Sequence, residues 1–149
     1  MKLNQEGINL ILSFEGFESQ PYICAGGKAT IGYGTTVYPN GVKVTMQDPP
    51  ITKATAKKLF EATIIPYENA VAQLVKYPIT ENQAAALISF TYNVGIANFK
   101  SSTLLKRVNA NTNDPAIRTE FSKWIKAKGK ILNGLIKRRK AESDLYFKR

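Results

Sequence analysis

Histidine is missing from this chain of 149 residues, and cysteine occurs only once, at position 24. A histidine-based catalytic triad, a Cys/His metal site and an internal disulfide are therefore excluded. No apolar run approaches the ~20 residues of a membrane span, and the first residues lack the basic-then-apolar pattern of a signal peptide. We expect a protein made in the cytoplasm, whose chemistry uses carboxylates, hydroxyls and one thiol without a metal or an organic cofactor.

Acidic residues are also scarce, because 11 Asp and Glu stand against 21 Lys and Arg, a formal net charge of +10. Residues 121–149 carry +8 of this charge. Such a segment favours polyanions, namely nucleic acid, anionic lipid or an anionic cell-wall polymer. It is equally consistent with the solvated face of a terminal helix. We expect no nucleic-acid binding, because the basic residues are not interleaved with a base-stacking platform or a groove-reading motif.

The first third of the chain predicts a helix followed by a small β lobe. Asn4 caps a helix whose apolar residues recur at helical spacing, and the Gly16 region ends it, so that Glu15 stands at its C-terminal end. Between Tyr22 and Val44, β-branched and aromatic residues are punctuated by glycine turns, which predicts two or three short strands.

The remainder of the chain predicts helices. Thr52 caps the next one, and Pro66 either kinks it or starts a second helix that runs to about Val75. A capping box over residues 80–83 precedes the apolar run 84–94, which we expect to be a buried central helix. Further helices are expected over residues 103–109 with Ser101 or Ser102 as cap, from Asp114-Pro115 through Ala127, and from Asn133-Gly134 to Phe147. The C-terminal lobe is therefore expected to be all helical.

Three reactive side chains, Glu15, Cys24 and Thr30, are separated by turn-rich sequence after the first helix. A carboxyl group held against apolar residues tends to stay protonated and can donate a proton to a leaving oxygen. A polar group on the other side of a sugar then acts on the anomeric carbon or on the attacking water. The thiol can attack as a thiolate or place water, and the sequence leaves both open. The layout is typical of a glycosidase cleft.

With these residues in place, the chain resembles the phage-type lysozymes, glycoside hydrolase family 24. The signature of that family is a Glu, eight residues, an Asp or Cys, five residues and a Thr, which falls here on Glu15, Cys24 and Thr30. Other matching blocks follow in order along the chain: Thr30–Thr35, Gln83–Leu87, Tyr92–Gly95 with Phe99, Ser102–Leu105, Phe121, Trp124, Gly134-Leu135 and Arg138–Glu142.

The resemblance implies an α+β, lysozyme-like fold with the active-site cleft between a small β lobe and a mostly helical lobe. The implied single domain, 1–149, divides at about residues 15–50 (β lobe), 51–76 (connecting helix) and 77–149 (helical lobe, with the first helix packed on it). It also implies a monomeric muramidase that hydrolyses the β-1,4 bond between N-acetylmuramic acid and N-acetylglucosamine in peptidoglycan. Glu15 would be the general acid, with Cys24 and Thr30 acting from the opposite side of the sugar.

Four further residues are expected to bind substrate on this resemblance. Asn93 is placed to hydrogen-bond an acetamido group, Tyr92 can stack on a sugar or pack in the core, Ser102 can contact the ligand or only cap a helix, and Thr36 completes the set.

The chain departs from the family pattern at Thr35, where a histidine is common. The first residues also lack the transmembrane-like export signal of some relatives, so we expect a separate, holin-like export partner. Two alternatives stay open: a non-enzymatic cationic protein that permeabilises the envelope through the basic C-terminal helix, and a lytic transglycosylase that cuts the same bond.

Overall fold

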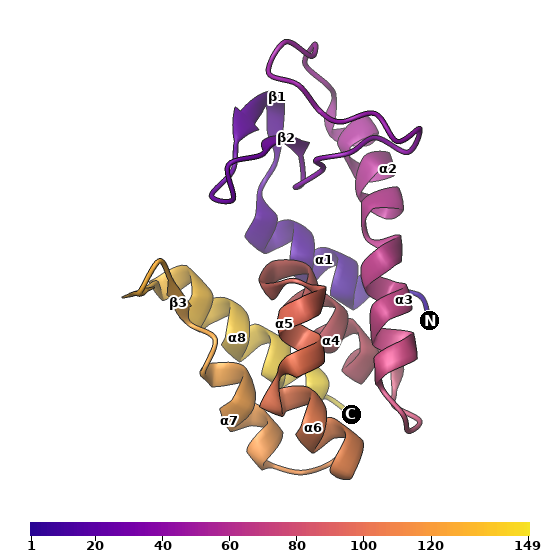
Figure 1. Cartoon of the computed structure of the whole chain (residues 1–149). Helices are drawn as coiled ribbons and strands as arrows, with labels where there is room; N and C mark the ends of the chain where they lie inside the picture. The colour runs from indigo at the N-terminus through magenta and orange to yellow at the C-terminus, as the bar shows by residue number, and fades with distance from the viewer. The chain divides into compact units, whose positions relative to one another are not determined.

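The computed structural model describes all 149 residues and divides the chain into two compact units. The first unit comprises Met1–Phe14 and Tyr67–Arg149, and the second comprises Glu15–Pro66. Helices predominate over two small antiparallel sheets, so the protein belongs to the α+β class (Figure 1). No helix combines the length and the apolar character that crossing a bilayer requires.

The second unit contains a β-hairpin, an irregular loop and one helix. Its elements are β1 (Glu18–Ile23), β2 (Ala29–Gly32) and α2 (Lys53–Thr63). Thr52 caps α2 as predicted, because its side chain accepts a hydrogen bond from the Thr55 N–H. At Gly32, with φ +69°, a Cβ would lie only 3.1 Å from the Cβ of Ala56. A glycine at this position therefore lets the hairpin approach α2 closely.

The first unit is built around a buried central helix. Its elements are α1 (Gln5–Glu15), α3 (Ile65–Leu74), α4 (Glu81–Val94), α5 (Ile96–Ser101), α6 (Thr103–Ala110), α7 (Ala116–Ser122), β3 (Lys126–Ala127), β4 (Lys130–Ile131) and α8 (Asn133–Tyr146), where Glu15 and the first two residues of α3 belong to the second unit. The predicted capping box of Thr80 and Gln83 starts α4, which is buried from Gln83 to Thr91. On α4, the ring of Phe90 packs edge to face on Phe121 and Trp124, with ring centroids 5.6 and 5.5 Å apart.

A buried ionic network fastens α8 to α4. Glu142 is fully buried and accepts hydrogen bonds from the Ser89 hydroxyl (2.6 Å) and from Nε of Arg138 (3.2 Å). Its other carboxylate oxygen lies 2.8 Å from Nε of Arg139, which is also buried. Arg138 donates in addition to the Ser89 carbonyl (3.1 Å). The two guanidinium groups share this one carboxylate, and Arg139 also donates to the Trp124 carbonyl (3.3 Å), so ion pairing and hydrogen bonds together offset part of the cost of burying these charges.

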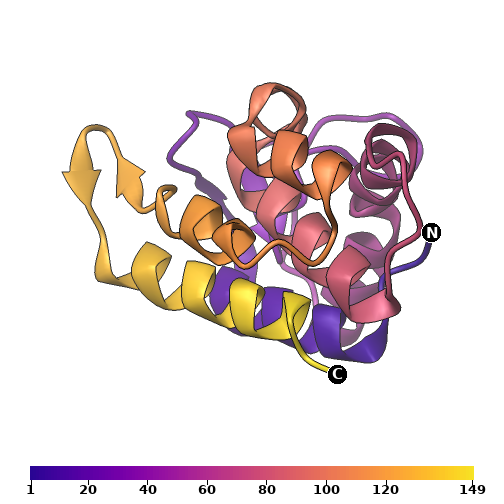
Figure 2. The same cartoon turned by 90° about the horizontal axis from the view of Figure 1, so that it is seen from below.

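The prediction of an all-helical C-terminal lobe is wrong. The helix expected to run through Ala127 ends at Ser122, and β3 pairs with β4 in a short antiparallel hairpin. Its turn is formed by Lys128 (φ +52°) and Gly129 (φ +78°), a left-handed pair that a helix cannot contain. Figure 2 shows the hairpin projecting beyond the helices next to the start of α8.

Candidate active site

Glu15 is the last residue of α1, as the sequence predicts. Gly16 follows it with φ +69°, a left-handed conformation that ends helices and suits glycine. The chain then enters β1 at Glu18. The side chain of Glu15 is half-buried. A single carboxyl group is thus held where a helix turns into the hairpin that carries the other two signature residues.

The β1–β2 hairpin brings Cys24 and Thr30 together. Tyr22 pairs with Thr30, and in the turn the Cys24 N–H donates to the Lys28 carbonyl at 3.0 Å. The Gly27 N–H donates to the Cys24 carbonyl at 2.9 Å, with Gly27 at φ +79°. The tight turn therefore places Cys24 next to the residues that begin β2.

The side chain of Cys24 is half-buried, and its surroundings stabilise the thiolate form relative to a free cysteine. A hydrogen bond from the Thr30 hydroxyl, assisted by the backbone N–H of Lys28, lowers the pKa of Cys24. The Thr30 hydroxyl has only one proton, and the Lys28 carbonyl at 2.9 Å competes for it. In the structure the buried hydroxyl of Thr30 donates to the Lys28 carbonyl while it lies beside the thiol.

Tyr22 belongs to the same cluster, although no motif in the sequence selects it. Burial raises the pKa of its phenol, and the nearby negative charges of Glu15, Cys24 and Glu18 raise it further. These interactions show that Glu15 and Cys24 lie near one phenol. Tyr22 joins the cluster through its pairing with Thr30 across an irregular hairpin, which no local sequence pattern indicates.

The two threonines that follow β2 have different surroundings. Thr35 is fully buried, and its hydroxyl lies 3.0 Å from that of Thr63. Because Thr63 donates its own proton to the Leu59 carbonyl (2.7 Å), Thr35 must be the donor of this bond. This hydrogen bond ties the loop that follows β2 to α2. Thr36 instead lines a cavity on the surface of the unit.

The other predicted substrate-binding residues lie in the first unit. Tyr92 is half-buried and packs edge to face on Tyr67, with ring centroids 4.9 Å apart. Asn93 is exposed near the end of α4. Ser102 is buried, and its hydroxyl accepts from the Leu105 N–H (3.1 Å) and donates to the Phe99 carbonyl (2.7 Å). The hydroxyl of Ser102 is thus used in capping α6.

Comparison with known proteins agrees with this fold. The chain belongs to the phage lysozyme family, whose model matches residues 12–142. The solved endolysin from Escherichia coli O157:H7 phage FAHEc1 superposes with a TM-score of 0.87 and 37% identity, covering 99% of this chain and 94% of that one. The predicted family and lysozyme-like fold are therefore confirmed.

Two endolysins from other phages are similar to this chain in sequence. The endolysin of Bacillus phage B103 is 40% identical over 152 residues, or 99% of this chain. The endolysin of Acyrthosiphon pisum secondary endosymbiont phage 1 is 37% identical and covers 98% of each chain. The chain spans about half the length of the Bacillus phage endolysins that it matches, 54% of the one from phage B103.

Proposed function

We propose that this chain is a peptidoglycan-degrading endolysin that hydrolyses the β-1,4 bond between N-acetylmuramic acid and N-acetylglucosamine, for lysis of a bacterial host. Membership of the phage lysozyme family supports the reaction class. The observation that carries the proposal is the β1–β2 hairpin, which places Cys24 close enough to Thr30 for the threonine to lower the pKa of the thiol, beside the Tyr22 phenol, whose pKa is raised by the charge of Glu15. An acid and a second reactive group are what glycoside hydrolysis requires.

In this reaction Glu15 donates its proton to the glycosidic oxygen as that bond breaks. Cys24 and Thr30 act on the other face of the sugar, in one of two ways. The thiolate attacks the anomeric carbon and forms a covalent glycosyl-enzyme that water then hydrolyses, which retains the configuration. Alternatively, the pair holds a water molecule and takes its proton, which inverts the configuration. The anomeric configuration of the first product distinguishes the two.

For substrate binding we propose that Asn93 hydrogen-bonds an acetamido group, that Tyr92 stacks on a sugar, and that Thr36 contacts the glycan. The exposed amide of Asn93 and the cavity beside Thr36 support these roles. Ser102 acts as a positioning residue, because its hydroxyl is held within the cap of α6. The predicted cleft between lobes and the separate export partner stay predictions.

The test compares Glu15→Gln with Glu18→Gln, an exposed neighbour on β1 that serves as a matched control. Loss of a general acid typically costs ~10²–10⁴ in rate, so Glu15→Gln should clear a wall suspension that much more slowly while the control variant stays near wild type. Circular dichroism verifies that both variants fold. Near-normal turnover by Glu15→Gln would remove the basis of the mechanism.

Mass analysis of digested peptidoglycan identifies the reaction. Hydrolysis leaves reducing muramic ends, whereas a lytic transglycosylase leaves anhydro ends. Anhydro products would show that the protein is a lytic transglycosylase and not a hydrolase. Lysis without cleavage of the glycan would favour the non-enzymatic, cationic protein.

A further inference from the structure

A cavity of about 230 Å³ lies in the second unit, and its walls come from residues on both sides of Thr30 in the sequence. It is lined by Lys28, Ala29, Thr36, Val37, Lys43 and Val44. Lys28 and Ala29 directly precede Thr30, and Ala29 begins β2. Pockets for whole drug-sized ligands measure about 300–1,000 Å³, so this cavity suits a substituent and not a disaccharide.

The wall of the cavity is held in place by the loop that follows β2. The Val44 N–H donates to the Thr36 carbonyl at 2.9 Å, and Val37 bridges to Lys43. At the end of the loop, the Tyr38 hydroxyl donates to Asp48 at 2.6 Å. Burial and this bond raise the pKa of Tyr38 to about 12. The cavity is thus largely formed before any ligand arrives, which reduces the entropy lost on binding.

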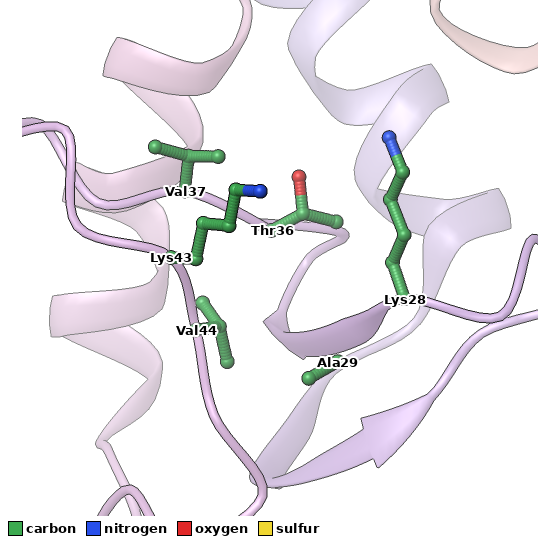
Figure 3. A pocket seen from close by; sticks show the side chains of 6 residues that line it. All are labelled: Lys28, Ala29, Thr36, Val37, Lys43 and Val44. Atoms are coloured by element: carbon green, nitrogen blue, oxygen red, sulfur yellow. The ribbon is translucent and has the colours of Figure 1, made fainter.

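The polar groups of the cavity are all suited to an anion. Figure 3 shows Lys28 and Lys43 on either side of Thr36, with the Lys43 ammonium directed toward the threonine hydroxyl. Both lysines are exposed, and neither has an ion-pair or hydrogen-bond partner for its ammonium group. No Asp or Glu occurs between Cys24 and Gln47 to neutralise them. The next acid, Asp48, is occupied by Tyr38 and Thr45.

The remaining walls are aliphatic and small. Ala29, Val37 and Val44 offer methyl groups only, and Val44 is buried. A ligand that fills this space needs a carboxylate beside a short apolar group, which a small amino acid with a free or side-chain carboxylate provides. A phosphodiester matches the charge, but it has no small side chain to place against the three methyl-bearing walls.

We propose that this cavity is a subsite for a carboxylate of the short peptide attached to the muramyl sugar, with Lys28 and Lys43 as its specificity-determining residues. The inference rests on the proposed function, since it assigns a part of the same substrate. The lysines bind the carboxylate, the Thr36 hydroxyl donates to it, and the aliphatic walls contact an adjacent methyl group. The enzyme then prefers glycan whose peptide substituents are present and ionised.

The experiment measures kcat/KM on three phosphate-free glycans: one with free peptide carboxylates, one with those carboxylates amidated, and one without peptides. The double variant Lys28→Gln/Lys43→Gln should lower the ratio of free-acid to peptide-free kcat/KM about tenfold, the effect of two exposed ion pairs and a shared hydroxyl. For the wild-type enzyme, kcat/KM on the amidated glycan should be lower than on the free-acid glycan by a similar factor. The single variant Lys43→Arg keeps the positive charge and should therefore retain more of the preference for the free-acid glycan than the single variant Lys43→Gln.

A matched control removes the same charge from the same unit, through Lys57→Gln/Lys58→Gln on the exposed part of α2. This variant should keep the wild-type ratio. The proposal is overturned if the control loses as much preference, because general attraction would then explain it. It is also overturned if the cavity variant keeps its ratio on phosphate-free glycan and loses activity only on walls that carry phosphate polymers.

Failure of the proposed function is recognised separately. Wild type that cleaves none of the three glycans contradicts the muramidase assignment. The subsite is then judged by equilibrium binding of the free-acid and amidated glycans to the Glu15→Gln protein, where the Lys28→Gln/Lys43→Gln changes should weaken binding of the free acid alone. Equal binding of both glycans would reject the subsite.

Discussion

Replacing Thr30 by valine should slow the reaction of Cys24 with an alkylating reagent at neutral pH. Valine keeps the shape of threonine but removes the hydroxyl that lowers the pKa of the thiol. The folded protein stabilises the thiolate, so removing the donor raises the pKa of Cys24 and leaves less thiolate at any pH below it. The Lys28 carbonyl keeps its bond from the Cys24 N–H, so the turn retains its closing contact.

The size of the effect follows from the surroundings of the sulfur. A hydrogen bond to a charged group contributes ~1.5–3 kcal/mol. The lower end applies, since Cys24 is half exposed and the Lys28 carbonyl at 2.9 Å competes for the same proton. A free-energy difference of ~1.4 kcal/mol is tenfold in an equilibrium constant. Because a thiolate of higher pKa is also the stronger nucleophile, the smaller thiolate fraction is partly offset, and we expect roughly a threefold lower alkylation rate.

The assay is the rate of iodoacetamide modification between pH 5 and 10, followed by mass spectrometry, and Cys24 is the only cysteine to be labelled. Thr30→Ser keeps the hydroxyl and should retain most of the wild-type rate. Thr30→Val should show its half-maximal rate at a higher pH than wild type. An unchanged profile for Thr30→Val, or an equal change for Thr30→Ser, would show that the hydroxyl does not control the thiol.

Three other sets of variants test the proposed catalytic thiol, the buried ionic network and the basic hairpin. Cys24→Asp should keep substantial activity and resist alkylation while Cys24→Ala loses most activity; a fully active Cys24→Ala would leave the water to Thr30 alone. Glu142→Gln removes the negative charge that pairs with two buried guanidinium groups and should cost ~3–5 kcal/mol, about 10 °C in melting temperature, whereas the exposed Glu6→Gln should change it little. Neutralising the exposed hairpin lysines should flatten the salt dependence of wall lysis, while cleavage of a short uncharged oligosaccharide stays as it was. Those lysines are Lys126, Lys128 and Lys130.

Most helix boundaries could be predicted because they are determined locally. Thr52, Thr80 and Ser102 each cap the helix that the sequence assigns to them, and Pro66 lies in the first turn of α3. The β3–β4 hairpin was missed because its strands have two residues each and its left-handed turn includes a lysine. Helix α5 was missed because Gly95, which ends α4, also starts the next helix.

The residues of the candidate site could be predicted where a fixed spacing along the sequence identifies them. They could not be predicted where only a contact in the folded structure does. The family signature selects Glu15, Cys24 and Thr30, and the hairpin register brings the last two close enough for Thr30 to lower the pKa of the thiol. The cluster around Tyr22 depends on which side chains share one face of a twisted, bulged strand pair, and no local pattern encodes that. The roles of these residues stay predictions until the variants are measured.

The basic charge of the chain separates into groups with different physical roles. Arg138 and Arg139 contribute to the +8 of the C-terminal segment, yet both are buried against Glu142 and are unavailable to a polyanion. Neutralising them would therefore test the stability of α8 and not its attraction to the wall. The hairpin lysines are exposed and act over a screening length of ~8 Å at physiological salt. Lys28 and Lys43 lie outside that segment, so at a fixed salt concentration neutralising the hairpin lysines should leave the preference of the cavity for carboxylates unchanged.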